Sequence, residues 1–582
     1  MKRSSALAVQ SSCTLTRRAR PWTSAAALVW CALTALMPAA HGAAADDDAK
    51  NSQRHSNDLA ADKGTTLAFD ASQYTTLAVT IDGRYVPVRW YKNICYVKRP
   101  VLMATTQTGL GGVPQTIDNP QCGYQNMNVF VAESALRDQT AALYLAVNNA
   151  GWMASYQRAS VTDGATLDSS TSPVAAALKA GYVYVDVATR GRNVVAADAT
   201  YAGRSPAAVV DAKAAVRYLR LNDDRMPGSA ERIVVNGTSG GGGLASILGA
   251  SGNSPDYYPY LAAVGAAGMD QRGRSTLRDD VLVVVAYCPI TDLGHADLAY
   301  EWLYTTLNSR ALAGTSNANP AASAAIAAGF PAYQRSLGLH NADGRRLTAD
   351  NMLETIKAEV VRSAETAMKA GNTLPRLGDS FAIAGMGGTR TYVNDWMDVD
   401  NAAGKVLSLD MTRYLAFVAT QATLKPAPAF DQSGLTALPN PAGESNLFGE
   451  PTQPYSNFTA YSWTHNDKAD GVGLDDTGLT WQQFLGHPGT IVDQQIRLLD
   501  PMRYIGSQAD TAPYWYVRHG TRDRDTAFTV SINLSRALSA DAHVADVNYR
   551  LAWNQPHAGN YDVPEAMAWV AKVLKAADRR GR

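Results

Sequence analysis

Residues 234–246, "VVNGTSGGGGLAS", place a serine between an apolar strand and a helix, and this stretch decides the fold. Gly237, Ser239 and Gly241 form a G-x-S-x-G pattern at that junction. In a nucleophile elbow the turn is so tight that the flanking positions must lack a Cβ, and the serine is held above the sheet at a helix N-terminus. We therefore predict that Ser239 is a nucleophile. The backbone N–H of Gly240 is then one donor of an oxyanion hole.

Two simpler interpretations of this stretch compete with the nucleophile. A phosphate-binding turn would need a following lysine or a well-formed G-x-G-x-x-G with a later acidic partner, and the sequence has neither. The stretch could also be only a tight turn. The strand-to-helix context favours the nucleophile over both.

The flanking sequence alternates apolar strands with helices, which predicts a mostly parallel sheet covered on both faces. We expect an α/β fold of the α/β hydrolase type, with a core formed by residues 63–295 and 501–582. Residues 296–500 break the alternation with helices and loops rich in Pro, Gly, Asn and Thr, and are predicted to form an inserted lid domain. The predicted strands and helices of the core are 141–151, 174–181, 182–191, 206–222, 232–243, 244–250, 281–293, 514–520, 528–540, 545–553 and a last helix from about 563.

The base and the acid of a hydrolase follow the serine in chain order, on loops after the final strands. His557, in "LAWNQPHAGNY", follows the last predicted strand and is the predicted base, whereas His519 and His543 suit packing or surface roles. Asp523 and Asp525 both follow the preceding strand. A helix predicted from about Thr526 would make Asp525 its N-cap, which favours Asp523 as the acid and leaves Asp525 as the alternative.

A second oxyanion donor is expected from the loop after an earlier strand. "AVNNAGW" (146–152) is the candidate loop, with Ala150 or Gly151 supplying the amide. An ordinary Asn/Gly turn explains the same residues about as well.

The N-terminus has basic residues, the apolar run "SAAALVWCALTALM" and then small residues, which together predict a signal peptide over residues 1–45. Residues 46–62 are predicted to be a polar tail. Export to a periplasm or to the medium would leave Cys95, Cys122 and Cys288 in an oxidising compartment. A disulfide between Cys95 and Cys122 would close a loop between two strands, and Cys288 is expected to be a buried free thiol.

The composition is balanced, with 52 basic and 52 acidic side chains and, beyond the N-terminus, no long single-sign run. Neither a nucleic acid nor a membrane is therefore expected as a partner, and the oligomeric state is left open. The loop "NDKADGVGLDD" (466–476) lacks the D-x-D-x-D-G spacing of a calcium loop and is predicted to be solvated. No metal is therefore expected there.

With these residues in place, the chain resembles the bacterial tannases, which are tannin acylhydrolases of the α/β hydrolase superfamily. The matching segments are "YKNICYVKRPV" (91–101), "NGTSGGG" (236–242), "AYCPITDLGHADLAYEW" (286–302), "WYVRHGTRDRDTAF" (515–528) and "NQPHAGNY" (554–561). The resemblance implies hydrolysis of galloyl esters without a cofactor, with Asp523 in the triad and Asp525 on the gallate hydroxyls.

In that family a lysine and a glutamate of the lid also bind the hydroxyls. The matching stretch 444–463 offers Glu444 and Glu450 but no lysine, and Glu450 is the predicted contact. The fungal-type tannases and feruloyl esterases carry cysteines next to the nucleophile and the histidine. Thr238 and Pro556 occupy those positions here, so that group is disfavoured.

Three other functions are compatible with parts of the sequence. A broader carboxylesterase for feruloyl or chlorogenate-type esters would use the same residues. An exopeptidase of the prolyl oligopeptidase kind has a similar core, but no propeller-like repeat precedes the core in this sequence. A binding protein on a hydrolase scaffold is disfavoured because serine, aspartate and histidine are all present in the right order.

Overall fold

The structure of the protein is a computed structural model that describes residues 67–109, 112–156, 159–314, 319–385, 388–432, 443–466 and 478–580. All of them belong to one compact unit, 54–582. The predicted signal peptide (1–45), the polar tail (46–62) and most of the acidic loop 466–476 lie outside the described residues.

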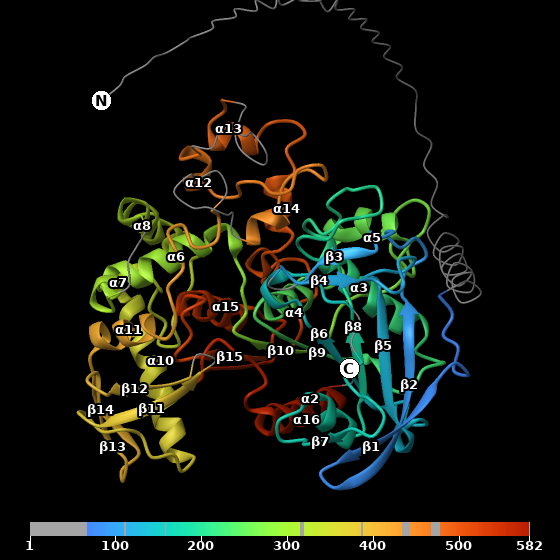
Figure 1. Ribbon diagram of the computed structural model, residues 1–582, viewed down its shortest axis with the longest axis horizontal. Helices are drawn as coiled ribbons and strands as arrows, with labels where there is room; N and C mark the ends of the chain where they lie inside the picture. Colours follow the sequence, from blue (N-terminus) through green and yellow to red (C-terminus); the bar gives the residue numbers. More distant parts are fainter. Residues whose placement is uncertain are drawn as a thin grey trace, which may run out of the picture. The chain divides into compact units, whose positions relative to one another are not determined.

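A ten-stranded sheet forms the core, in the order β16-β15-β10-β9-β6-β8-β5-β2-β1-β7 (Figure 1). The strands from β16 to β8 are parallel, whereas β8, β5, β2 and β1 pair antiparallel. The strands are β1 (Thr75–Ile81), β2 (Arg84–Cys95), β5 (Asn126–Ala132), β6 (Ala142–Val147), β7 (Thr166–Leu167), β8 (Val183–Val187), β9 (Ser229–Thr238), β10 (Val283–Tyr287), β15 (Tyr514–Gly520) and β16 (Asp546–Ala552). The predicted α/β hydrolase fold is confirmed.

Helices cover both faces of this sheet, which is why strands at its centre, such as β6 and β10, are buried along their whole length. In β10, Val283 and Val285 join the core beneath one set of helices, while Val284 and Ala286 join the core on the other side. Successive side chains of a strand point to opposite faces, so a strand buried on both faces reads as a continuous apolar run. The helices on one face are α2 (Pro173–Lys179) and α16 (Val563–Arg579), and those on the other include α3 (Ala207–Leu221), α4 (Gly240–Ala250) and α15 (Phe528–Ala540).

The segment predicted as a lid, 296–500, consists of helices and short hairpins (yellow-green to orange in Figure 1). Its first helix already begins at Leu293, within the "AYCPITDL" stretch. Its elements are α6 (Leu293–Thr306), α7 (Ser309–Leu312), α8 (Pro320–Ala327), α9 (Phe330–Ser336), α10 (Ala349–Lys369), β11 (Ser380–Gly385), β12 (Gly388–Val393), β13 (Met397–Asp400), β14 (Lys405–Leu409), α11 (Met411–Ala419), η5 (Gly443–Leu447), α12 (Ala460–Thr464), α13 (Trp481–Leu485) and α14 (Val492–Arg497). Its role as a lid stays a prediction.

The remaining elements are short and lie in the connections. They are β3 (Thr106–Thr108), β4 (Pro114–Thr116), η2 (Glu133–Ala135), η3 (Ala150–Trp152), η4 (Pro255–Tyr257), α5 (Tyr258–Val264) and η6 (Pro501–Arg503). Within the described ranges no helix is both long and apolar enough to cross a membrane.

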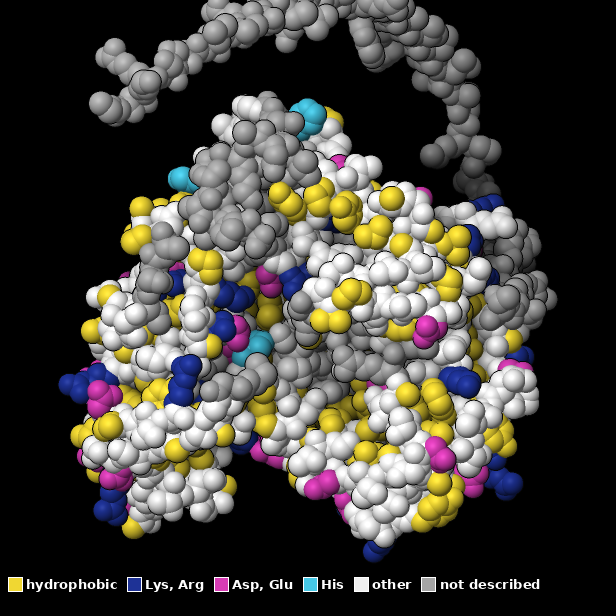
Figure 2. Space-filling model, in the orientation of Figure 1, with side chains coloured by type: hydrophobic (Ala, Val, Ile, Leu, Met, Phe, Trp, Pro, Cys, Tyr) yellow, Lys and Arg dark blue, Asp and Glu magenta, His cyan; other side chains and the backbone are white. Residues whose placement is uncertain are grey.

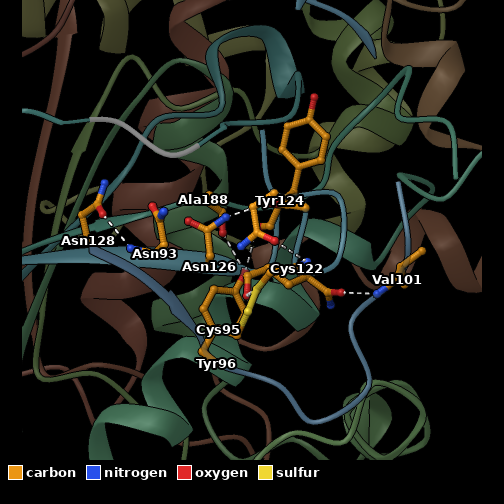
Figure 3. Close-up of a disulfide and its surroundings, with 12 residues drawn as sticks. Asn93, Cys95, Tyr96, Val101, Cys122, Tyr124, Asn126, Asn128 and Ala188 are labelled. Atoms are coloured by element: carbon orange, nitrogen blue, oxygen red, sulfur yellow. Dashed lines mark hydrogen bonds between the residues drawn. A yellow bond between two sulfur atoms is a disulfide. The ribbon is translucent and has the colours of Figure 1, made fainter. Parts of the chain in front are cut away.

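The end of β2 is linked to the turn before β5 by a disulfide between Cys95 and Cys122, with their Cα atoms 5.9 Å apart (Figure 3). This pair was predicted from the sequence and is confirmed. The hydroxyl of Tyr96, next to it, donates a hydrogen bond to the carbonyl oxygen of Ala188 at 2.7 Å and lies 3.3 Å from that of Tyr124. The disulfide and these bonds together tie the antiparallel half of the sheet to the strand β8.

Candidate active site

Ser239 lies in the turn between β9 and α4 with a backbone conformation that L-residues rarely adopt, φ 61° and ψ −124°. The glycines around it are required by close backbone contacts. A Cβ on Gly237 would lie 2.1 Å from the carbonyl oxygen of Gly241, and a Cβ on Gly241 would lie 2.6 Å from that of Val147. The elbow predicted from "NGTSGGG" is therefore present, and its strain holds the Ser239 side chain in one position.

Two hydrogen bonds connect Ser239 to the ends of the last two strands. His557 Nε2 lies 2.8 Å from Ser239 Oγ, and His557 Nδ1 lies 2.7 Å from Asp523 Oδ2. Because the Asp523 carboxylate can only accept, Nδ1 carries the proton and Nε2 is free to accept the serine proton. The three residues that the sequence predicted thus form one hydrogen-bonded series. Ser239 and His557 are 318 residues apart in the sequence, and Asp523 and His557 are 34 residues apart.

Asp523 is fully buried and its two oxygens have different partners. Oδ1 accepts the backbone N–H groups of Asp525 at 2.8 Å and Thr526 at 3.3 Å, and Oδ2 faces His557 and also lies 3.3 Å from His519 Nε2. Burial by itself would raise the pKa of the Asp523 carboxyl, but the two imidazoles and their hydrogen bonds hold that pKa well below its usual range. Asp523 therefore remains an anion at neutral pH.

The helix predicted over 528–540 is confirmed, but the predicted start at about Thr526 with Asp525 as its N-cap is wrong. Helix α15 begins at Phe528 with Ala527 as its N-cap, and no side chain caps it. The physical reason is that Asp523 Oδ1 binds the amides of Asp525 and Thr526, so these residues form a turn closed by an Asx side chain instead of the first turn of a helix. The sequence predicted that Asp525 would accept hydrogen bonds from free backbone N–H groups here. Asp523 accepts such bonds instead, in addition to facing His557.

His557 lies between two buried groups, Asp523 and the free thiol of Cys288. Burial by itself would lower the pKa of His557, yet the Asp523 carboxylate beside it raises that pKa well above its usual range. Cys288, at the end of β10, is the buried free cysteine that the sequence predicted, and its Sγ lies 3.2 Å from the carbonyl oxygen of Ala558. Donor atoms of Cys288, Asp523 and His557 lie within 4.8 Å of one another. Burial raises the pKa of the thiol, which works against the thiolate that a metal ion would need.

The predicted oxyanion loop lies directly against the start of α4. A Cβ on Gly240 would lie 2.2 Å from the backbone nitrogen of Trp152 and 2.4 Å from the carbonyl oxygen of Asn149. Among the described residues, the amides of Gly240 and Gly151 have no hydrogen-bond acceptor, whereas the amides of Ala150 and Trp152 are both used inside the loop. The arrangement favours Gly151 over Ala150 as the second donor.

Asp525 and His557 both line one cavity of about 630 Å³. The cavity therefore lies beside the histidine that is hydrogen-bonded to Ser239. Figure 2 shows basic, acidic and histidine side chains together where the surface is hollowed at the centre of this face. Arg524 forms an ion pair with Asp525, whose side chain is 30% exposed. The cavity is lined by Ile383, Ala384, Gly385, Gly388, Arg390, Tyr392, Gln421, Ala422, Thr423, Arg522, Arg524, Asp525, Pro556 and His557.

Glu450 does not lie with these residues. It is exposed and lines a separate cavity together with Trp463 and Phe484, so the predicted substrate contact is placed away from Asp525. Glu444, which the sequence offered beside it, is buried in η5. Both glutamates belong to one irregular stretch, and no periodicity in it indicates which side chain turns inward.

Arg192 is a site residue that the sequence reasoning missed. Its guanidinium lies 3.1 Å from where a Cβ of Gly151 would be, and its charge is close enough to Glu444 for that carboxylate to act on it. Burial lowers the pKa of Arg192, with Glu444 opposing that change. A glutamate and an arginine therefore stand beside the oxyanion loop. The only sequence signal was the motif "TRGR" at the end of a strand, which by itself is not specific.

A strained serine at a strand–turn–helix elbow, hydrogen-bonded through a histidine to an aspartate after the next-to-last strand, defines the protein as an α/β hydrolase. Residues 136–328, which contain the elbow, match the protein family BD-FAE. No curated protein matches the sequence.

Solved structures of bacterial tannases are similar to this chain over most of its length. Tannin acyl hydrolase from Lactobacillus plantarum is 28% identical with a TM-score of 0.65, over 87% of this chain and 99% of that chain. Fusobacterium nucleatum tannase is 29% identical with a TM-score of 0.67, over the same shares. A tannin acyl hydrolase in complex with ethyl gallate, 29% identical, has a TM-score of 0.66 over 87% and 99%. The resemblance to the bacterial tannases is confirmed, and the chain is a structural homologue of carboxylic ester hydrolases.

Proposed function

We propose that the protein is a serine esterase that hydrolyses galloyl ester bonds of tannins and simple gallates and releases gallic acid. The observation that carries this proposal is the hydrogen-bonded chain Ser239–His557–Asp523. Its occurrence in a fold similar to a tannin acyl hydrolase that is in complex with ethyl gallate supports the galloyl group as the acyl part.

The proposed reaction is a two-step acyl transfer. Ser239 Oγ attacks the ester carbonyl carbon while its proton passes to His557 Nε2, and the amides of Gly240 and Gly151 donate to the developing oxyanion. The carbon–oxygen bond then breaks, and His557 returns the proton to the leaving alcohol. Water attacks the acyl-serine in the same way and releases the acid. Water and the ester supply every atom of the products, so the proposal includes no cofactor.

Asp523 has two duties in this mechanism. Its Oδ2 fixes the Nδ1–H tautomer of His557 and stabilises the imidazolium that forms when the serine proton is taken. Its Oδ1 holds the turn that carries Asp525 into the cavity. A single buried carboxylate thus positions both the base and the proposed specificity residue.

Asp525 is proposed to accept hydrogen bonds from the phenolic hydroxyls of the galloyl ring. It lines the same cavity as His557 and its carboxylate is partly exposed, so a ligand can reach it. Arg524 pairs with Asp525 Oδ1, so a benzoate without hydroxyls would leave Oδ2 without a partner, which costs about 1–3 kcal/mol.

The test is a panel of methyl gallate, methyl ferulate and propyl benzoate, read for released acid. The proposal expects methyl gallate to be turned over fastest and propyl benzoate slowest. Similar rates on methyl gallate and methyl ferulate would replace it with the broader phenolic-acid carboxylesterase. Turnover of a dipeptide amide without ester turnover would point to an exopeptidase, and failure of a fluorophosphonate probe to label Ser239 would point to a binding protein.

Export to a periplasm or to the medium is proposed on the predicted signal peptide, 1–45. The Cys95–Cys122 disulfide supports an oxidising compartment. Expressed from the full sequence in a bacterial host, the protein is expected in the periplasm or the medium with its N-terminus removed. A protein that stays in the cytoplasm at full length would contradict the proposal.

A further inference from the structure

The cavity that contains His557 and Asp525 carries more positive charge than its proposed role for the galloyl ring requires. Its lining includes three arginines, Arg390, Arg522 and Arg524, against the single carboxylate of Asp525. Arg524 is already paired with Asp525. Within the described ranges no carboxylate lies in ion-pair distance of Arg390 or Arg522, so two charges at this wall have no counterion.

Arg522 holds its position through neutral partners only. Its Nε donates to the carbonyl oxygen of Asn554 at 2.9 Å, and its Nη1 donates to Gln421 Oε1 at 2.8 Å. These bonds orient the guanidinium and leave its remaining N–H groups unused. Partial burial lowers the pKa of Arg522, as expected for a cation that is removed from water without a carboxylate beside it.

Arg390 lines the same cavity from β12, the second strand of the β11–β12 hairpin. Its Nη1 is 3.4 Å from the carbonyl oxygen of Thr420, and its side chain is exposed. The two arginines therefore come from segments that are distant in the chain and meet only at this cavity. Arginine guanidinium groups bind carboxylates with paired, geometrically matched hydrogen bonds.

We propose that Arg522 and Arg390 form an anion subsite for a carboxylate on the alcohol part of the ester, so that galloyl esters of hydroxy acids are the preferred substrates. This inference rests on the proposed function, because Asp525 is assigned there to the hydroxyls of the acyl ring. A carboxylate on the acyl ring would be repelled by Asp525. The unpaired arginines are consequently available to the other end of the substrate.

The test uses pairs of substrates that differ only in charge: carboxymethyl gallate and 4-carboxybenzyl gallate, each with its own methyl ester. At low salt the wild-type protein is expected to have a kcat/KM at least about 10-fold higher for the free acid than for the methyl ester in at least one pair, about 1.4 kcal/mol. Because the preference is electrostatic, it should shrink as salt is added.

Variants separate the subsite from a purely structural role of the arginines. Arg522→Gln and Arg390→Gln should each bring the ratio of acid to methyl ester toward one, mainly through KM, while Arg522→Lys retains part of the preference. Arg345→Gln is the matched control, because Arg345 pairs with Asp343 and Glu354 on the surface and does not line the cavity. Its ratio should equal that of the wild type.

Several results would overturn the inference. A wild-type protein that hydrolyses methyl gallate but shows no preference for either free acid refutes the anion subsite and leaves the proposed function intact. If Arg522→Gln and Arg390→Gln slow the acid and its methyl ester by the same factor, the two arginines only hold the loops together. If methyl gallate itself is not hydrolysed, the proposed function is refuted. This outcome is distinguishable from a failure of the anion subsite alone, in which methyl gallate is still hydrolysed.

Discussion

The core and the inserted segment contribute to the site in different ways. On the core side, Ser239, His557 and Asp523 follow strands of the sheet, and each is held by a hydrogen bond of 2.7–2.8 Å. On the other side, Arg390 and Gln421 belong to the inserted segment, are at least partly exposed and make few contacts. The core side is preorganised for one chemical step, which is where catalytic effects are largest. The inserted side offers charges and amides that can select a substrate without changing that step.

The loop "TRDRDT" connects the two sides. Asp523 turns into the core and Asp525 turns into the cavity, although they are two residues apart. Substitutions on the core side should therefore reduce turnover of every ester. Substitutions on the cavity side should change the order in which esters are preferred.

Ser239→Ala should reduce kcat on methyl gallate by about 10⁶-fold, because no other group supplies the nucleophile. Gallate should still bind, since the cavity wall is unchanged. Turnover and calorimetric binding of gallate measure the two effects. Ser336→Ala, on the surface of α9, is the control and should match the wild type. Residual turnover above a few per cent would assign the nucleophile elsewhere.

Asp523→Asn should reduce kcat by about 10⁴-fold on all esters, because the amide stabilises the wrong tautomer of His557. The pH profile gives a second measurement. His557 must be neutral to accept the serine proton and its pKa is raised, so wild-type kcat/KM should fall as the pH drops through a value well above 6.5. Without the Asp523 charge this acidic limb should move to lower pH. An unchanged limb would show that another group controls it.

Asp525→Asn should lower kcat/KM for methyl gallate by about 10- to 100-fold, corresponding to about 1–3 kcal/mol, and change hydrolysis of an aryl acetate little. Glu450→Gln is the matched control: Glu450 lines a separate cavity, so both substrates should be unaffected. Equal losses on gallate and acetate in Asp525→Asn would mean that Asp523 and Asp525 do not divide chemistry and recognition between them.

The Cys95→Ser, Cys122→Ser double variant should leave kcat within about twofold of the wild type, because the disulfide lies in the antiparallel half of the sheet (Figure 3). It should lower the free energy of unfolding by about 3 kcal/mol, from the loop of 27 residues that the bond closes. Denaturant unfolding with and without reductant measures this. A large loss of kcat at full folding would connect this region to the site after all.

Much of the fold and the central site could be predicted from the sequence because the signals are local and ordered along the chain. The glycines around Ser239 report a steric requirement that exists at that turn alone, and His557 was found by its place after the last strand. That Asp525 does not cap α15 could not be predicted, because the Asp523 side chain binds the amides of Asp525 and Thr526. Helix propensity alone contains no information on those bonds.

The sequence by itself predicted the hydrolase fold, the tight turn around Ser239 and the choice of His557 among the histidines. Only the tertiary structure decided that Cys95 and Cys122 are bonded, that Asp523 also closes the turn, that Glu450 lines a separate cavity, and that Arg192 lies beside Gly151. It also decided that Arg390 and Arg522 share one wall. The physical reason is the distance along the chain over which each feature is set. Strand periodicity and tight turns depend on neighbouring residues. The arginines that line the cavity come from segments more than a hundred residues apart, which meet only when the chain has packed.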